Sequence, residues 1–312
     1  MNNSLPFVRR TARSPARRLV AALALRILMH WAKEHRKEGL PRLAVFSQDL
    51  ISMEIITYGL YEREYLDLLF TWLAPSSDAM RRAIAIDIGA NLGNHSLYLS
   101  RYFSRVIAIE PNPRIFSILQ INSNNVDNIT ALNVGLSDRP LNALMQENPL
   151  NLGGSRVLDT ISDPPPGSTL GIHLTTLDAI VANLNIDNIF LIKIDAEGFE
   201  ARIISGGTAV LEKYKPVVLF ELHESDIKNG SAEVVELLRQ RDYDIFTVEK
   251  NLRLADHGAL RFFGFLLRLF IGETLTIRPV VTLPARFHQM VIAVHKDFPT
   301  LACKPLMNAG SA

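Results

Sequence analysis

The chain has 312 residues, of which 48% are hydrophobic and 21% are charged. This composition excludes a disordered chain, and a chain of this length can bury a core without disulfide bonds. The single cysteine, Cys303, excludes an internal disulfide and a cysteine-based zinc site. With 33 Lys and Arg residues against 32 Asp and Glu residues, no excess of positive charge is available for nucleic acid, and we expect no such partner.

The N-terminus is basic. Residues 1–33 carry seven Lys and Arg side chains and no acidic one. The apolar run Leu19–Trp31 is interrupted by Arg26 and His30, so it is too short and too charged to cross a bilayer, which takes about 20 apolar residues. Three interpretations of residues 1–38 stay open: a helix that packs on the main domain, a peripheral contact with an anionic membrane surface, and a cleaved targeting segment. We expect a cytoplasmic protein, associated peripherally with a membrane on the second interpretation.

Residues 1–75 are predicted to form a helical extension. The spacing of apolar residues predicts helices over Ala16–Lys37 and Tyr61–Leu73, with an extended piece over Leu43–Thr57 between them. The turn-forming residues Pro75–Asp78 then close the extension.

From Ala83 onward, short apolar segments alternate with helical ones, which is typical of a doubly wound parallel sheet. The expected strands are Ala83–Ile88, Val106–Glu110, Ile129–Val134, Ile189–Asp195, Pro216–Leu222, Tyr243–Lys250 and Met290–Asp297, the last two as an antiparallel pair. The expected helices are Asn94–Phe103, Pro113–Ser123, Glu200–Leu211 and Ala232–Arg241. We therefore predict an α/β fold in which residues 76–300 form a doubly wound, mostly parallel, seven-stranded Rossmann-like sheet, followed by a tail at 301–312.

Two insertions interrupt the alternation, at residues 139–174 and 251–289. The first is rich in Gly and Pro, and we expect a loop with short extended pieces over the top of the sheet. Within it, Gly153–Arg156 either contacts a substrate or forms a plain β-turn. The second insertion contains the apolar, basic segment Arg261–Phe270, which is either a lid over the substrate or a helix that caps the end of the sheet.

The first predicted strand leads into a glycine turn at Asp87–Asn94, with the sequence DIGANLGN. Small residues here let the backbone approach a ligand, and the helix that follows offers unpaired N–H groups at the same edge of the sheet. The dinucleotide fingerprint G-x-G-x-x-G is not met, because Asn91 stands at the position of its second glycine and Gly93 comes too early for the third. This argues against NAD or FAD, and so against an NAD-dependent oxidoreductase.

Acidic residues at three successive strand ends suit S-adenosylmethionine instead. Asp87 can meet the ammonium group of its amino-acid tail, Glu110 can accept from both ribose hydroxyls, and Asp138 is placed to accept from the adenine amino group. The glycine turn makes room for the ligand, and the residues after Glu110 form the wall beside the adenine. The predicted cofactor-binding residues are Asp87, Gly89, Ala90, Asn91, Gly93, Glu110, Pro111, Asn112 and Asp138.

Seven short motifs follow one another along this part of the chain. They are IDIGANLGNHSL (Ile86–Leu97), AIEPNP (Ala108–Pro113), NVGLSD (Asn133–Asp138), NLGGS (Asn151–Ser155), TTLDAI (Thr175–Ile180), LIKIDAEGFE (Leu191–Glu200) and PVVLFELHE (Pro216–Glu224). In this order they resemble the FkbM-type methyltransferases of the class I S-adenosylmethionine-dependent fold. The resemblance implies transfer of a methyl group from S-adenosylmethionine to a small-molecule or glycan acceptor, typically to a hydroxyl oxygen of a sugar, glycan or other natural product.

Charged side chains gather at the ends of the fourth and fifth predicted strands, which face the point of methyl transfer. These catalytic candidates are Lys193, Asp195, Glu197, Glu221 and His223. Asp195 is the first candidate for contact with the reacting end of the cofactor or the acceptor hydroxyl, although a helix N-cap would explain it equally well. Glu197 or His223 could act as general base. Lys193 is expected to pair with neighbouring carboxylates, because a lone buried ammonium is costly.

These residue types would allow Mg²⁺ or Mn²⁺, but carboxylate-rich sheet edges are common without metal and we expect none. His95, in the helix after the glycine turn, is expected to be structural or adjacent to the cofactor. The leading hypothesis is an S-adenosylmethionine-dependent O-methyltransferase. The alternative is a non-catalytic methyltransferase-like scaffold associated with a membrane glycan or lipid pathway. The oligomeric state stays open.

Overall fold

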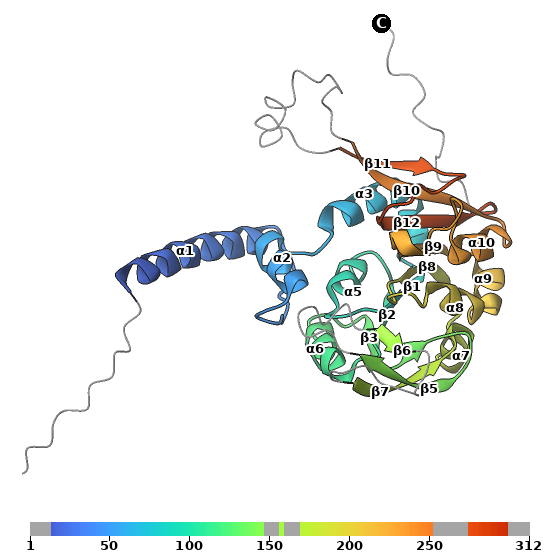
Figure 1. The fold of residues 1–312 in the computed structure, drawn as a ribbon, viewed down its shortest axis with the longest axis horizontal. Coiled ribbons are helices and arrows are strands. Elements are labelled where there is room, and N and C mark those ends of the chain that lie inside the picture. The colour runs from blue at the N-terminus through green and yellow to red at the C-terminus, as the bar shows by residue number, and fades with distance from the viewer. Residues whose placement is uncertain (1–13, 147–155, 159–168, 252–273, 299–312) are drawn as a thin grey trace, which may run out of the picture.

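Among the residues that the structure describes, the main sheet has eight strands in the order β11-β10-β12-β9-β8-β1-β2-β3 (Figure 1). The computed structural model describes residues 14–146, 156–158, 169–251 and 274–298. The strands of the main sheet are β1 (Ile84–Ile88), β2 (Arg105–Ile109), β3 (Ile129–Leu132), β8 (Ile189–Ile194), β9 (Val217–Leu222), β10 (Tyr243–Asn251), β11 (Thr274–Pro279) and β12 (His288–His295). The predicted α/β, doubly wound, mostly parallel architecture is confirmed. The apolar segment 261–270 and residues 153–155 of the first insertion lie outside the described residues.

The sheet has one strand more than the seven predicted. The additional strand, β11, pairs antiparallel with β10 at the edge of the sheet and comes from the predicted insertion at 251–289. Its β-branched residues Thr274, Thr276 and Ile277 favour a strand. A six-residue edge strand has too weak a pattern to stand out beside a long insertion. The predicted antiparallel pairing of the last two strands is confirmed for β10 and β12.

Strand β1 lies between β2 and β8, and all three run parallel. Each residue of β1 after Ile84 is buried, as expected of a central strand with helices on both faces. The register places Asp87 beside Ala108 of β2 and beside Lys193 of β8. Because parallel strands end at the same edge of a sheet, the residues that follow these three strands meet there.

Helices cover both faces of the main sheet. The helices are α3 (Arg63–Leu73), α4 (Ser77–Met80), α5 (Asn94–Leu99), α6 (Pro113–Ser123), α7 (Leu177–Asn183), α8 (Glu200–Ser205), α9 (Thr208–Tyr214) and α10 (Glu233–Arg239), with short 3₁₀ segments at Ala74–Ser76 and Glu224–Asp226. Strand residues alternate between two cores: Ile86 and Ile88 pack with α8, α9 and α10, whereas Ala85 packs with α3 and α5. The sheet is therefore buried on both sides, which leaves its carboxyl edge as the place for a ligand.

The helix predicted over Glu200–Leu211 is divided into α8 and α9. The division falls at Gly206 and Gly207, where the chain passes close to the second sheet. A Cβ atom on Gly206 would lie 2.1 Å from the carbonyl oxygen of Ser137, so only glycine fits there. The helical spacing of apolar residues continues across the break, which is why the sequence predicts one helix.

The predicted loop at 139–174 is wrong in part, because most of its described residues belong to a second, four-stranded sheet. Its strands are β4 (Gly135–Leu136), β5 (Leu141–Gln146), β6 (Arg156–Leu158) and β7 (Thr169–Thr175), in the order β4-β7-β5-β6. Alternate residues of β5 and β7 are buried, namely Ala143, Met145, Ile172 and Leu174. A Gly- and Pro-rich stretch separates β5 from β7 in the sequence, so the two-residue period does not predict that these strands pair.

The N-terminal extension contains α1 (Pro15–Lys37) and α2 (Leu50–Tyr58) besides α3. The extended piece predicted over Leu43–Thr57 is wrong, because α2 occupies most of it. Asp49 caps α2 by accepting from the backbone N–H of Ser52 at 2.9 Å, and Gly59 ends it with φ of 85°. The β-branched residues of α2 favoured a strand, and the two capping residues were the stronger signal.

Helix α1 extends away from the body of the protein (Figure 1), and it is described over its whole length without one buried residue. The structure therefore does not support the interpretation in which this helix packs on the main domain. Across the described ranges, no helix is long and apolar enough to cross a membrane.

Candidate active site

The glycine turn joins β1 to α5 and brings the end of β8 against it. Gly89 has φ of 72°, and a Cβ atom there would lie 1.8 Å from the carbonyl oxygen of Asp195. The backbone N–H groups of Gly89 and Ala90 both donate to the carbonyl of Ile109 at 2.9 Å. Asn91 also has a positive φ, of 50°. The turn is thus fixed to the ends of both neighbouring strands, and glycine is required at its first position.

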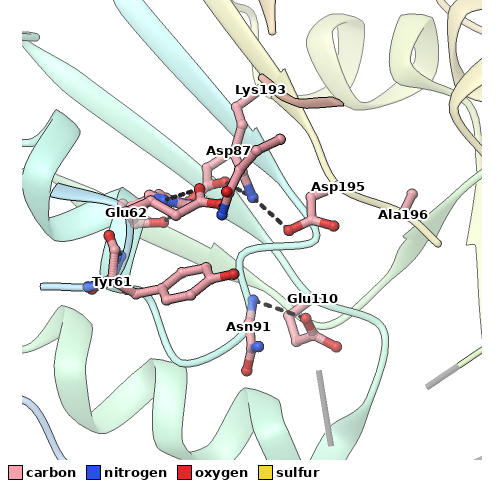
Figure 2. Close-up of polar contacts among 12 residues, drawn as sticks. Tyr61, Glu62, Asp87, Asn91, Glu110, Lys193, Asp195 and Ala196 are labelled. Carbon is pink, nitrogen blue, oxygen red and sulfur yellow. Dashed lines mark hydrogen bonds and ion pairs between the residues drawn. The ribbon is translucent and has the colours of Figure 1, made fainter. Parts of the chain in front are cut away.

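Glu110 follows β2, and its side chain points into the space beside this turn (Figure 2). It is only 6% exposed. Its Oε2 atom accepts from the backbone N–H of Asn91 at 3.0 Å, and its Oε1 atom accepts from the backbone N–H of Asn112 at 2.9 Å. Burial raises the pKa of this carboxyl to about 7, although the two backbone hydrogen bonds oppose the shift. Each carboxylate oxygen keeps a further lone pair for a ligand.

Lys193 lies between two carboxylates at the same edge of the sheet (Figure 2). Its Nζ atom is 3.2 Å from Oδ2 of Asp195 and 3.5 Å from Oδ1 of Asp87. Asp87 is fully buried, and its Oδ2 atom also accepts from the hydroxyl of Ser96 at 2.6 Å. Burial opposes the charge on Lys193, but the two aspartates outweigh it and raise the pKa of the ammonium above its usual range. Lys193 is thus a buried cation that fixes both aspartates, as predicted from the cost of burying it alone.

A pocket of about 650 Å³, counted to its open mouth, lies at this edge; we call it the main pocket. Its polar side chains are Asn91, Glu110, Asp195 and Glu197. Apolar side chains line it from the second sheet, through Leu136, Met145, Val157 and Leu174, and from the main sheet and α8, through Ile88, Ile109 and Ile203. The pocket therefore combines carboxylates at strand ends with apolar walls from both sheets.

The other predicted cofactor residues lie behind this wall or away from it. Ala90 is buried, Gly93 precedes α5 with φ of 89°, and Asn112 is the N-cap of α6. These three residues shape the turn and the wall without lining the main pocket, and the fully buried Asp87 does not line it either. Asp138 is exposed, and its Oδ1 atom accepts from the hydroxyl of Ser137 at 2.9 Å, so the structure does not bring it into the main pocket.

The remaining catalytic candidates lie beside the main pocket. His223 follows β9, and its Nε2 atom is 3.8 Å from Oε2 of Glu197, which itself has a positive φ of 49°. Glu221 lines a smaller pocket with Lys193. Burial and the nearby charge of Asp195 raise the pKa of Glu221 to about 9. Glu221 is therefore protonated near neutral pH and is a poor base there.

The N-terminal extension also reaches this site, which the sequence did not predict. The ring of Tyr61 points from the extension toward Asn91 and Asp195 (Figure 2). Glu62 lines the same small pocket as Lys193 and Glu221. No signal in the sequence links Tyr61 or Glu62 to the glycine turn, because the connection depends on how α3 packs against α5.

Residues 87–245 match the Methyltransferase FkbM domain. The chain belongs to the FkbM methyltransferase family. The predicted resemblance is confirmed, and the cofactor of this methyltransferase is S-adenosylmethionine.

Relatives of this methyltransferase include hexuronic acid methyltransferase AglP from Haloferax volcanii, which is 26% identical over 170 residues covering 51% of this chain and 68% of AglP. Among solved structures, methyltransferase FkbM from Methylobacillus flagellatus is 18% identical with a TM-score of 0.31, covering 63% of this chain and 48% of that one. The O-methyltransferase from Bacillus cereus, solved with SAH, is 14% identical with a TM-score of 0.38, covering 86% and 90%. The family assignment rests on the match over residues 87–245.

The main pocket of the methyltransferase fits S-adenosylmethionine. The two oxygens of Glu110, each holding one backbone N–H, leave one lone pair apiece, which suits the two hydroxyls of a ribose. The apolar wall from the second sheet suits an adenine ring. Within the described ranges, no three Asp, Glu, His or Cys side chains are grouped so as to hold a metal ion.

Proposed function

We propose that this methyltransferase transfers the methyl group of S-adenosylmethionine to a hydroxyl oxygen of a sugar, glycan or other natural product. The observation that carries the proposal is that Glu110 and Asp195 line one pocket at the edge of the sheet, with Asp195 paired to Lys193. One side of the main pocket thus suits a nucleoside, and the other presents a carboxylate to an acceptor. The relative named for hexuronic acid supports a sugar as acceptor.

When bound, S-adenosylmethionine supplies an electrophilic methyl group on a sulfonium. The protein must then position an acceptor hydroxyl and remove its proton as the oxygen takes the methyl group. We assign the proton to Asp195, which lines the main pocket and is held by Lys193. Glu197 also lines the main pocket. The Nε2 atom of His223, whose side chain is 44% exposed, is 3.8 Å from Oε2 of Glu197, so a proton can pass from Glu197 through His223 to solvent. Lys193 acts by fixing Asp195.

Methylation of oxygen is tested with S-adenosylmethionine that carries a deuterated methyl group. The protein is incubated with glycans and small molecules extracted from its own cells, and labelled products are analysed by mass spectrometry and NMR. We expect a labelled methoxy group on a hydroxyl carbon, formed by the wild type and lost in Asp195→Asn. A label found on nitrogen would refute oxygen as the acceptor. Binding of the cofactor with no labelled product from any extract would favour the scaffold alternative.

We also propose that α1 attaches the enzyme to an anionic membrane surface. One side of α1 carries apolar residues at helical spacing, namely Val20, Leu23, Ala24, Ile27, Leu28 and Trp31. Leu23 is 61% exposed and Ile27 is 42% exposed. The opposite side carries Arg18, Arg26, Lys33 and Arg36, with Leu25 and Met29 between them. A basic helix with an uncovered apolar side lies in the plane of an anionic bilayer, and its positive charge argues for lipid over a second copy of itself.

Vesicle sedimentation tests this attachment, with vesicles of phosphatidylcholine alone or mixed with phosphatidylglycerol. We expect the full chain to sediment with the anionic vesicles, and deletion of residues 1–38 or Leu23→Glu to abolish this. Val281→Glu is the matched control, because Val281 is 85% exposed and lies outside α1. Unchanged sedimentation after the deletion would refute the proposal. A dimer in solution that Leu23→Glu dissociates, without vesicle binding, would replace the membrane with a second copy.

A further inference from the structure

A second, larger groove runs along the N-terminal extension. It is lined by residues from the end of α2 to the first turns of α3, together with Lys250 of β10 and Gln289 of β12, and it measures about 1340 Å³ to its open mouth. Tyr58 and Tyr61 line it, and Tyr58 is 64% exposed. Glu62 and Gln289 also line the small pocket that contains Lys193, so the groove adjoins that small pocket. We call it the extension groove.

Two consecutive residues of α5 hold the segment Tyr61–Glu62 in place. The side chain of Asn94 accepts from the backbone N–H of Tyr61 and donates to its carbonyl, both at 3.0 Å. The Nε2 atom of His95 is 3.2 Å from one carboxylate oxygen of Glu62, and Gln289 donates to the other at 2.5 Å. Glu62 has a positive φ of 56°, a conformation that costs free energy and persists because these contacts hold it. The extension is thus attached to the helix that follows the glycine turn.

Tyr61 connects the extension groove to the main pocket. It lines the groove, and its ring points toward Asn91 and Asp195, which line the main pocket (Figure 2). Burial, followed by the negative charges of Glu62 and Glu221, raises the pKa of its phenol above the usual range. The hydroxyl therefore keeps its proton at any physiological pH and can donate a hydrogen bond at the point of methyl transfer.

The charge of the extension groove limits what it can accept. Among the described residues that line it, the carboxylates are Glu54, Glu62, Glu64 and Asp67, and the cations are Arg63 and Lys250. Arg63 is paired with Glu38 and Asp67, and Glu62 is held by His95 and Gln289. The carboxylates of the groove outside these contacts are Glu54 and Glu64, against the one cation Lys250 among the described lining residues. Carboxylates accept hydrogen bonds from hydroxyl and ammonium groups, and a tyrosine ring packs against the apolar face of a sugar. A ligand that carries its own carboxylate would meet an excess of like charge.

We infer that the extension groove is the acceptor site and that it takes an uncharged or amine-bearing sugar in preference to a uronic acid, with Tyr61 donating to the acceptor at its inner end. The inference rests on the proposed function. It differs from the relative named for hexuronic acid, whose acceptor is anionic. It also assigns the N-terminal extension a role in choosing the acceptor.

Fluorine NMR of the full chain, labelled with 3-fluorotyrosine and saturated with S-adenosylhomocysteine, tests this site. The signals are assigned with Tyr58→Phe, Tyr61→Phe and Tyr214→Phe, and the probes are the methyl glycosides of glucose, glucosamine and glucuronic acid. Tyr214 is the control, because its hydroxyl donates to the carbonyl of Ile186 away from the groove. We expect millimolar glucoside or glucosaminide to shift Tyr58 and Tyr61 but not Tyr214, and the glucuronide to bind about tenfold more weakly.

The Tyr58 signal also reports binding in Tyr61→Phe, where we expect the glucoside to bind several-fold more weakly because one hydrogen bond is lost. Unmoved Tyr58 and Tyr61 signals with all three sugars, or glucuronide binding as tight as glucoside binding, would overturn the inference. Calorimetry on the same sample separates the two claims. If S-adenosylhomocysteine fails to bind, the proposed function fails; if it binds and the tyrosine signals stay fixed, only the acceptor site fails.

Discussion

Lys193 determines the charge balance of the active site. It lies within 3.5 Å of Asp87 and 3.2 Å of Asp195, and Asp87 is fully buried. In Lys193→Met these carboxylates keep their negative charge without a partner. Since removing one partner of a buried ion pair leaves an uncompensated charge, we expect the free energy of unfolding to fall by about 3–5 kcal/mol. Urea unfolding measures this, with the exposed Lys228→Met as control.

Adding Asp195→Asn to Lys193→Met removes one of the unpaired charges and should restore part of the lost stability. A loss below about 1 kcal/mol in Lys193→Met would show that the ammonium is not needed to compensate these carboxylates.

We expect Glu110 to make cofactor binding depend on pH. Its pKa is raised to about 7 by burial, so it is charged above pH 7 and protonated below it. A protonated carboxyl accepts fewer hydrogen bonds, and we expect the affinity for S-adenosylhomocysteine to fall as the pH drops through 7. Glu110→Gln should bind more weakly and show a flatter profile. Calorimetry on either side of pH 7 gives both results; identical profiles for the two proteins would assign the pH dependence to another group.

At the scale of residues, the sequence predicts a site residue where a strand end determines its position. Asp87, Glu110 and Asp195 come at the ends of buried parallel strands, so their meeting follows from the sheet. Asp138 follows the short strand β4, which belongs to the second sheet, and this directs it away from the main pocket. Tyr61 is brought in by packing between distant helices, for which the sequence has no local signal.

We expect helix α1 to contribute little to the stability of the fold. None of its described residues is buried, whereas Leu69 of α3 is fully buried in one of the two cores. We expect deletion of residues 1–33 to change the free energy of unfolding by less than about 0.5 kcal/mol, and Leu69→Ala to lower it by about 2–5 kcal/mol. Urea unfolding of both variants checks this. A large loss on deletion would mean that α1 packs on the body of the protein.

At the scale of elements, the sequence predicts segments whose apolar pattern is clear and fails where local preference and packing disagree. The buried strands β1, β2, β8 and β9 are recognisable because each is an apolar run that ends at the same edge. Helix α2 was missed because its β-branched residues favour strands locally, while packing of the extension and the cap at Asp49 decide its conformation.

For the molecule as a whole, the sheet order explains how one chain builds both the main pocket and a wall of the extension groove. The central position of β1 brings the glycine turn between the ends of β2 and β8, which forms the main pocket. The strand β12, inserted antiparallel between β9 and β10, carries Gln289 to the extension. The sequence predicts the first arrangement from its motifs. The second depends on the contact of Gln289 with Glu62. These residues are far apart in the sequence, so no local pattern predicts that they meet.

We expect the main pocket to bind S-adenosylmethionine through Glu110. Calorimetric titration with S-adenosylhomocysteine tests it on the wild type, Glu110→Ala and Asp138→Ala. We expect micromolar binding by the wild type, a loss of about tenfold or more in Glu110→Ala, and no change in Asp138→Ala, which lies outside the main pocket. A folded wild type that does not bind, or a loss in Asp138→Ala with none in Glu110→Ala, would contradict the assignment.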